Sequence, residues 1–285
     1  MSFERDVERA AWSALVLELT LAPKPGLVTP FSRGSHADMD HRHFNASIDA
    51  LNGYFGDCAR LAAAGADLPA LQARGMMAET VMFAATGGIN THKGAIFTLG
   101  LLAAAAGRQR ALGEPASQQL GTLVAEAWGD ALLDAAASTR ADSHGLRVRR
   151  TLGLPGAREQ AANGFPVLFG TTLPALQEAR RRLGSDARAL LHALIATIAV
   201  LPDSNLAHRG GRGGLEWARA MATDFITAGS VFGAGHARRL SALCAAFEKR
   251  RLSPGGSADL LAAALFVEAL PACTPRRAHA DALTT

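Results

Sequence analysis

The stretch Thr86-Gly87-Gly88-Ile89-Asn90-Thr91-His92-Lys93-Gly94 leads directly into a long apolar run, Ala95 to Ala106. The paired glycines allow the backbone unusual dihedral angles and a close approach to a ligand. Asn90 and Thr91 are residue types that cap a helix by accepting hydrogen bonds from its free N–H groups. The stretch therefore predicts a turn followed by a core helix.

Two basic residues, His92 and Lys93, fall at the start of this predicted helix. Anions are favoured at that end of a helix, so a cation there is explained best by a bound phosphate. Only three basic residues of the chain are lysines, and Lys24 lies in a second Gly/Pro turn, as if a compact ammonium were needed in both places. The alternative is that Asn90 and Thr91 only cap the helix, because the P-loop pattern G-x-x-x-x-G-K-[ST] is absent.

The composition predicts an all-α fold. Of the 285 residues 49% are hydrophobic, Ala and Leu dominate, and Tyr occurs once, which favours helices over sheets. No fixed repeat or change of composition marks a boundary, so we expect a single domain, 1–285, of roughly ten helices. The apolar spacing places them at 3–21, 44–62, 69–83, 95–106, 117–137, 173–183, 187–200, 215–229, 236–251 and 260–270, with 165–168 as the one candidate strand.

Charge and targeting signals exclude several classes of function. The net charge is +4, and no basic stripe with interleaved aromatic residues is present, so we expect no nucleic-acid partner. The N-terminus is charged, and the apolar runs are shorter than the ~20 residues of a membrane span. Three isolated cysteines, Cys58, Cys244 and Cys273, lack disulfide or zinc spacing. We expect a cytoplasmic protein that does not contact a membrane.

The irregular segment Leu27–Asp40 lies between two predicted helices and is rich in polar side chains. Asp38 and Asp40, with Ser35 and His36 beside them, supply the oxygen ligands that suit Mg²⁺ bound to phosphates. The alternative is that Asp38 or Asp40 caps the next helix. Glu79 lies near the end of its helix, where the dipole disfavours an acid, so it is a candidate ligand or base, or an ordinary exposed residue.

Two later breaks in the helical pattern have the same character. Asp203, Asn205, His208 and Arg209 crowd together before paired glycines, and the segment 252–259 contains Gly255-Gly256-Ser257. Ser257 is a plausible N-cap, and the glycines before it free backbone N–H groups for a second phosphate site. A long connection at 140–158 is of the kind that is often functional or mobile.

Taken together, these motifs span nearly the whole chain and resemble the triphosphoribosyl-dephospho-CoA synthase family. The resemblance is carried by Pro25-Gly26-Leu27-Val28, Ser35-His36-Ala37-Asp38-Met39-Asp40, Gly87 to Ala95, Asn163-Gly164-Phe165-Pro166, Asp203 to Gly211 and Leu252 to Leu260. One departure is Ala157-Arg158-Glu159-Gln160, where an Arg-Gly-Glu type of sequence is expected, so the role of Glu159 is open.

The resemblance implies an all-helical transferase that uses ATP and 3'-dephospho-CoA. It would move the triphosphoribosyl group to the ribose 2'-hydroxyl and release adenine. The product is a prosthetic-group precursor for citrate lyase or malonate decarboxylase, passed to a phosphoribosyl-dephospho-CoA transferase and an acyl carrier protein. On this basis we expect a nucleotide site made of Lys24, Ser35, His36, Asn90, Thr91, His92, Lys93, Asn205, His208, Arg209, Gly255, Gly256 and Ser257.

The acids Asp38, Asp40, Glu79 and Asp203 are candidates for binding Mg²⁺ or for base catalysis, and the sequence does not separate these roles. Two rival interpretations stay open. An all-helical Mg²⁺-dependent ADP-ribosyl hydrolase would also cleave ribosyl bonds but would not need dephospho-CoA. A helical interaction module for a carrier protein would not bind a nucleotide tightly, and a scaffold has no use for separate Gly/polar motifs.

Overall fold

Helices are the only regular structure in residues 2–113, 119–138 and 153–271, which the computed structural model describes, apart from one isolated bridge between Thr29 and Ser32. The expected all-α fold is therefore confirmed. In chain order the helices are α1 (Phe3–Thr20), α2 (His41–Ala50), α3 (Tyr54–Ala63), α4 (Leu68–Ala85), α5 (Lys93–Leu112), α6 (Leu120–Ser138), α8 (Ala157–Ala162), η1 (Leu168–Thr172, a π-helix), α9 (Leu173–Arg182), α10 (Asp186–Val200), α11 (Ser204–Thr227), α12 (His236–Lys249) and α13 (Gly255–Ala269).

Helix α5 is the core helix that the opening stretch predicts. Nearly every residue from Ala95 to Gly107 is buried, and the helix packs against α3, α4, α6 and α13. Its glycines let α3 approach closely, because a Cβ at Gly107 would lie 2.0 Å from the Ala59 carbonyl oxygen. The apolar run therefore forms a helix that neighbours enclose on all sides.

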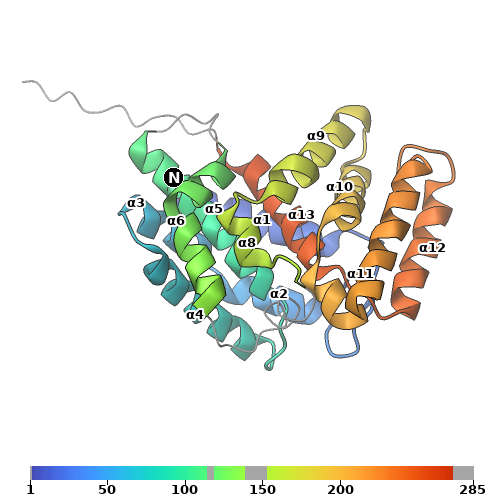
Figure 1. Cartoon of the computed structure of the whole chain (residues 1–285), viewed down its shortest axis with the longest axis horizontal. Coiled ribbons are helices and arrows are strands. Elements are labelled where there is room, and N and C mark those ends of the chain that lie inside the picture. Colours follow the sequence, from blue (N-terminus) through green and yellow to red (C-terminus); the bar gives the residue numbers. More distant parts are fainter. Residues whose placement is uncertain (1, 114–118, 139–152, 272–285) are drawn as a thin grey trace, which may run out of the picture.

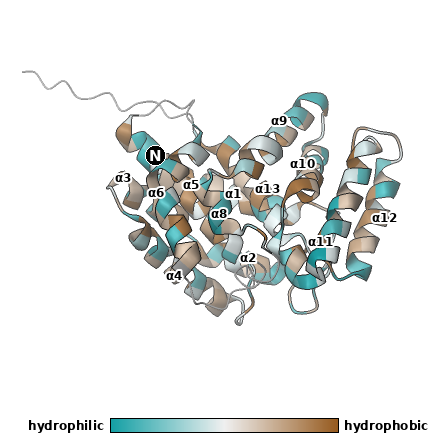
Figure 2. Cartoon of the chain, viewed as in Figure 1, coloured by the Kyte–Doolittle hydropathy of each residue, from teal (hydrophilic) through white to brown (hydrophobic). Residues whose placement is uncertain are grey.

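Helix α13 joins the two sides of the molecule. It packs against α1 and α5 on one side and against α10 on the other, and it lies between these helices in Figure 1. Its residues Leu260–Phe266 are all buried, and Figure 2 shows it as largely hydrophobic, whereas α9, α11 and α12 carry many hydrophilic residues. The N-terminal end of α13 is thereby brought to the same place as that of α5.

Two local predictions are wrong. The segment 165–168 is not a strand: Phe165 has a positive φ of 56° and Leu168 begins η1. A short apolar run does not distinguish a strand from a buried helix by its spacing. Helix α11 begins at Ser204 rather than near 215, because Asp203 caps it, and the glycine-rich part produces a kink at Gly211 instead of a loop.

Further predictions concern loops, thiols and membrane spans. Residues 140–152 of the expected long connection lie outside the described part of the chain, and its last residues begin α8. Cys58 and Cys244 are free thiols, and Cys273 lies outside the described residues. Within the described ranges no single helix is long and apolar enough to cross a membrane, although α10 and α11, bent by 54°, meet that criterion as a pair.

Candidate functional site

A cavity of about 690 Å³ lies where several helices begin. The first turns of α5, α11 and α13 all line it, together with the end of α1 and the segment between α1 and α2. Helix N-terminal ends present free N–H groups and a positive partial charge, so three of them around one space favour a polyanion. Lys24, Lys93 and Arg209 add positive charge to the same lining.

Most of the nucleotide-site residues expected from the sequence meet at this cavity, although they come from distant parts of the chain. Four do not line it: Ser35, Asp40, Glu79 and Ser257. Those that do are Lys24, His36, Asp38, Asn90, Thr91, His92, Lys93, Asp203, Asn205, His208, Arg209, Gly255 and Gly256.

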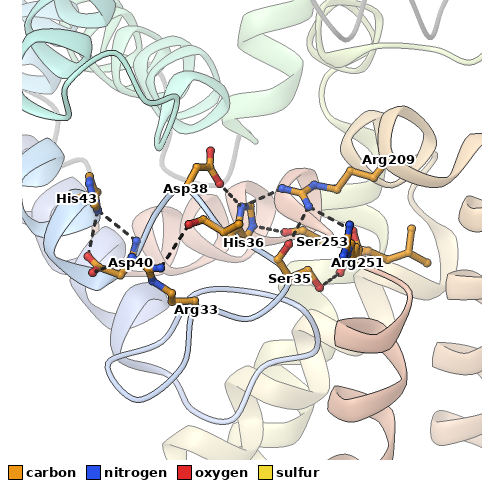
Figure 3. Close-up of polar contacts among 11 residues, drawn as sticks. Arg33, Ser35, His36, Asp38, Asp40, His43, Arg209, Arg251 and Ser253 are labelled. Atoms are coloured by element: carbon orange, nitrogen blue, oxygen red, sulfur yellow. Dashed lines mark hydrogen bonds and ion pairs between the residues drawn. The ribbon is translucent and has the colours of Figure 1, made fainter.

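Arg209, His36 and Ser253 form a chain of hydrogen bonds at the cavity edge (Figure 3). Arg209 Nη2 donates to His36 Nδ1 at 2.9 Å, and His36 Nε2 lies 2.9 Å from Ser253 Oγ. Since a guanidinium only donates, His36 carries its proton on Nε2 and donates it to Ser253. Burial and the Arg209 charge lower the pKa of His36 to about 4. His36 is therefore a neutral linker and cannot activate Ser253 as a base.

The same arginine fastens the loop between α1 and α2 to the start of α13. Arg209 Nη1 donates to the carbonyl oxygens of Ser35 and Arg251, and Ser35 Oγ donates to the Leu252 carbonyl oxygen at 2.6 Å. Ser35 thus holds two chain segments together and lies outside the cavity lining. Its predicted role in binding the nucleotide does not fit this geometry.

Asp38 and Asp40 differ in their surroundings (Figure 3). Asp40 is the N-cap of α2: its carboxylate accepts from the Arg42 N–H and lies 3.0 Å from His43 Nδ1. This is the capping alternative, and it takes Asp40 away from the cavity. The side chain of Asp38 lines the cavity, is 61% exposed, and lies 3.8 Å from His36 Nδ1.

The two lysines expected at phosphate sites also differ. Lys24 is buried, and its Nζ donates to both the carbonyl oxygen and Oε1 of Glu18 at 2.6 Å. Lys93 Nζ forms an ion pair with Glu79 Oε2 at 2.7 Å and remains 45% exposed. Glu79 therefore pairs with Lys93 and does not line the cavity, whereas Lys93 lines it and can exchange this pair for a phosphate.

Asp203 is saturated with hydrogen bonds. Its Oδ1 accepts from the N–H groups of Asn205 and Leu206, and its Oδ2 accepts from the N–H and hydroxyl of Ser257, at 2.8 to 3.4 Å. The carboxylate thereby ties the start of α11 to the start of α13. Ser257 is not the N-cap of α13, which is Pro254, and its donors are used by Asp203. Neither residue has a free group for a metal or a phosphate.

His92 and Thr91 present buried polar atoms without partners among the described residues. His92 Nδ1 is 2.7 Å from Ser47 Oγ, but His92 Nε2 and Thr91 Oγ1 have no hydrogen bond. Burial and the Lys24 charge lower the pKa of His92 to about 3, so the ring is neutral. Buried polar groups are rarely left unpaired. These two atoms are therefore suited to a ligand that is polar at this end of the cavity.

Two acids in the cavity were not assigned a role from the sequence, Glu18 and Asp259. Asp259 lies in the second turn of α13, partly buried, and its carboxyl group makes no hydrogen bond within the described residues. Burial and the nearby acids Asp203 and Glu18 raise the pKa of Asp259 well above its usual value. The available signal was an acid beside apolar residues of a helix, since Glu18 is flanked by Leu17 and Leu19 and Asp259 precedes Leu260-Leu261.

The four acids expected to bind Mg²⁺ do not form a metal site. Asp40 caps a helix, Glu79 pairs with Lys93, and Asp203 is fully bonded. Across the ranges 2–113, 119–138 and 153–271 no group of three or more His, Cys, Asp or Glu side chains is placed to hold a metal ion. The role of Glu159 is clearer: its Oε2 accepts from the Gly156 N–H and so caps α8.

Comparison with known proteins agrees with the motifs. Residues 4–277 match the family model described as ATP:dephospho-CoA triphosphoribosyl transferase. Proteins named probable 2-(5''-triphosphoribosyl)-3'-dephosphocoenzyme-A synthase are 38% identical in Acinetobacter calcoaceticus (90% of this chain, 88% of that protein) and 41% in Pseudomonas paraeruginosa strain DSM 24068 / PA7 (92% and 89%). No solved structure matches. The resemblance is confirmed, and the chain belongs to the ATP:dephospho-CoA triphosphoribosyl transferase family.

Proposed function

We propose that this protein transfers the triphosphoribosyl group of ATP to the ribose 2'-hydroxyl of 3'-dephospho-CoA and releases adenine. The observation that carries the proposal is the meeting of three helix N-terminal ends with Lys93 and Arg209 around one cavity. This arrangement suits a triphosphate. Its volume of about 690 Å³ is in the range of small-molecule sites.

The polar groups suggest how ATP is oriented. The N–H groups at the starts of α5 and α13 and the Lys93 ammonium hold the phosphates. Thr91 Oγ1 and His92 Nε2, unpaired among the described residues, make further hydrogen bonds to the nucleotide. Apolar side chains of the lining, among them Phe44 and Phe83, form a surface for the adenine ring.

We still expect Mg²⁺ to take part in the reaction, but without a metal site built from the four predicted acids. Because the expected ligands do not gather, we propose that Mg²⁺ arrives with the triphosphate of ATP, as this ion prefers substrate phosphates to protein cages. Asp38 is the one candidate acid with an exposed carboxylate at the cavity. An Asp38→Asn variant should need a higher Mg²⁺ concentration for half-maximal rate; an unchanged requirement would remove Asp38 from this role.

The remaining expectations concern where the enzyme acts in the cell and which proteins receive its product. We propose that the enzyme is cytoplasmic and that its product passes to a phosphoribosyl-dephospho-CoA transferase and then to an acyl carrier protein. Malonate decarboxylase is our preferred destination over citrate lyase, on overall resemblance.

The decisive experiment is incubation of the purified protein with ATP, Mg²⁺ and 3'-dephospho-CoA, followed by mass analysis. We expect one adenine for each triphosphoribosyl adduct formed. CoA in place of dephospho-CoA should react poorly, because its 3'-phosphate crowds the attacking 2'-hydroxyl. Absence of adenine would refute the proposal, and release of free ribose triphosphate without an adduct would support a hydrolase instead.

A further inference from the structure

Asp259 stands apart from the other acids at the cavity. Four carboxyl groups line this space: Glu18, Asp38, Asp203 and Asp259. Glu18 is paired with Lys24, Asp203 accepts four hydrogen bonds, and Asp38 faces solvent beside His36. Of the four, only Asp259 is partly buried, faces the cavity and has no hydrogen-bond partner in the described part of the chain.

The Asp259 carboxyl group lies against Gly94, in the first turn of α5. A Cβ at Gly94 would lie 2.0 Å from Asp259 Oδ2, so the absence of a side chain at Gly94 makes the space that the carboxyl group occupies. Asp259 is thus held against the first turn of α5, between two helices that pack closely. A partly buried carboxyl group that lines a cavity and has no internal partner is available to a ligand bound there.

The charges around Asp259 favour its protonated form. Asp203 at the start of α11 and Glu18 on α1 both act on it with like charge, and burial adds to their effect. Lys24 is engaged by Glu18, and His92 is neutral. The cavity therefore contains an acid whose surroundings raise its pKa and favour its protonated form, as they do for the carboxylic acids that protonate leaving groups in glycosyl transfer.

We propose that Asp259 is the general acid that protonates the adenine ring as the glycosidic bond of ATP breaks. This inference rests on the proposed function, since it assigns a proton donor for that reaction. A neutral adenine leaves far more readily than an adenine anion, so a positioned acid lowers the barrier. The assignment also explains why this one carboxyl group is left without an internal partner.

The step balances as follows. The bond between ribose C1 and adenine N9 breaks, and its electron pair goes to the purine. The Asp259 proton moves to a ring nitrogen of adenine, which leaves as the neutral base. The 2'-hydroxyl oxygen of dephospho-CoA forms the new bond to C1 and releases its proton to water, and Asp259 regains a proton from water. No net proton is consumed.

The test compares Asp259→Asn with wild type on two substrates. With ATP, we expect the variant to lose about 10²- to 10⁴-fold in kcat, the usual contribution of a general acid, with a similar KM. With 7-methyl-ATP, whose purine already carries a positive charge and needs no proton, we expect the two rates to agree within about tenfold. Asp203→Asn is the matched control: it should show no such dependence on the leaving group.

A second measurement uses wild type alone and so does not depend on how the variant folds. The kcat for ATP should fall as pH rises and Asp259 ionises, whereas initial rates with 7-methyl-ATP should not fall. A parallel decline for both substrates, an equal loss by Asp259→Asn on both, or a full rate of Asp259→Asn with ATP would overturn the proposal. Recovery of the variant by raised Mg²⁺ would also overturn it, by making Asp259 a metal ligand. If wild type releases no adenine, it is the proposed function that fails.

Discussion

Asp203 and Asp259 are two acids in the same wall of one cavity, yet their surroundings are opposite. Asp203 accepts four hydrogen bonds and connects the starts of α11 and α13. Asp259 lies in the second turn of α13, and its carboxyl group accepts no hydrogen bond within the described residues. Asp203 is buried and Asp259 is partly buried, so the main difference between them lies in their hydrogen bonding. A satisfied buried acid maintains the framework, and an unsatisfied one is available for chemistry.

The largest effect is expected from removing the framework acid. Asp203→Ala leaves four donors at two helix starts without their acceptor, and we expect a loss of roughly 3 kcal/mol in the free energy of unfolding. Denaturant unfolding followed by circular dichroism measures it. Asp259→Asn is the comparison and should not destabilise the protein. If both variants lost the same free energy of unfolding, the proposed difference between these two acids would be wrong.

Next in size is a change that moves Asp259 without altering its chemistry. Gly94→Ala places a methyl group where the Asp259 carboxyl group lies, and we expect kcat to fall about 100-fold, as for a catalytic group displaced by about 1 Å. Gly213→Ala is the matched control, because a Cβ there meets no atom within 4 Å. Steady-state kinetics decides the matter, and full activity of Gly94→Ala would show that the position of Asp259 is not important.

A smaller effect is expected for Lys93, which differs from Lys24 as Asp259 differs from Asp203. Lys24 is buried and donates two hydrogen bonds to Glu18, whereas Lys93 is half-exposed and can break its ion pair with Glu79. We expect Lys93→Ala to raise the KM for ATP about tenfold, the value of one charge-assisted contact. Lys249→Ala, on α12 and outside the cavity lining, should leave KM unchanged. A KM that stays the same in Lys93→Ala would place the triphosphate elsewhere.

The smallest effect is a change of stability with pH. A raised pKa in the folded state means that folded Asp259 holds a proton that the unfolded chain gives up. Its contribution is therefore fully present below the unfolded value of about 4 and is lost as pH rises through the folded pKa. We expect Asp259→Asn to melt at about the same temperature as wild type near pH 4 and at a higher one near pH 7.5. A constant difference across this range would contradict the raised pKa.

Much of the fold could be predicted from local sequence patterns. The run after Lys93 predicted α5, because an apolar segment of that length behind capping residues forms a buried helix in almost any surroundings. The alternative that Asp40 caps a helix was also visible in its spacing. The segment 165–168 and the start of α11 were misread, because an apolar run and a polar glycine-rich run each fit two structures until their packing is known.

Only the general location of the candidate site could be predicted from the sequence. The motifs that predicted it do meet at one cavity, but Asp40, Glu79, Ser35 and Ser257 proved to be bonded within the protein or directed elsewhere. Residue type indicates which chemistry a side chain can perform. It does not indicate whether an internal partner has already used that capacity.

The sequence by itself determined the helices, the glycine turns and the membership of a transferase family, because these depend on local propensity and on motifs read along the chain. Only the tertiary structure decided which acid is bonded within the protein and which is left without an internal partner. Glu18 and Asp203 come from distant parts of the chain and, together with burial, raise the pKa of Asp259, while Gly94 leaves the space for its carboxyl group. Burial and the field of neighbouring charges depend on distances in space, which the order of residues does not contain.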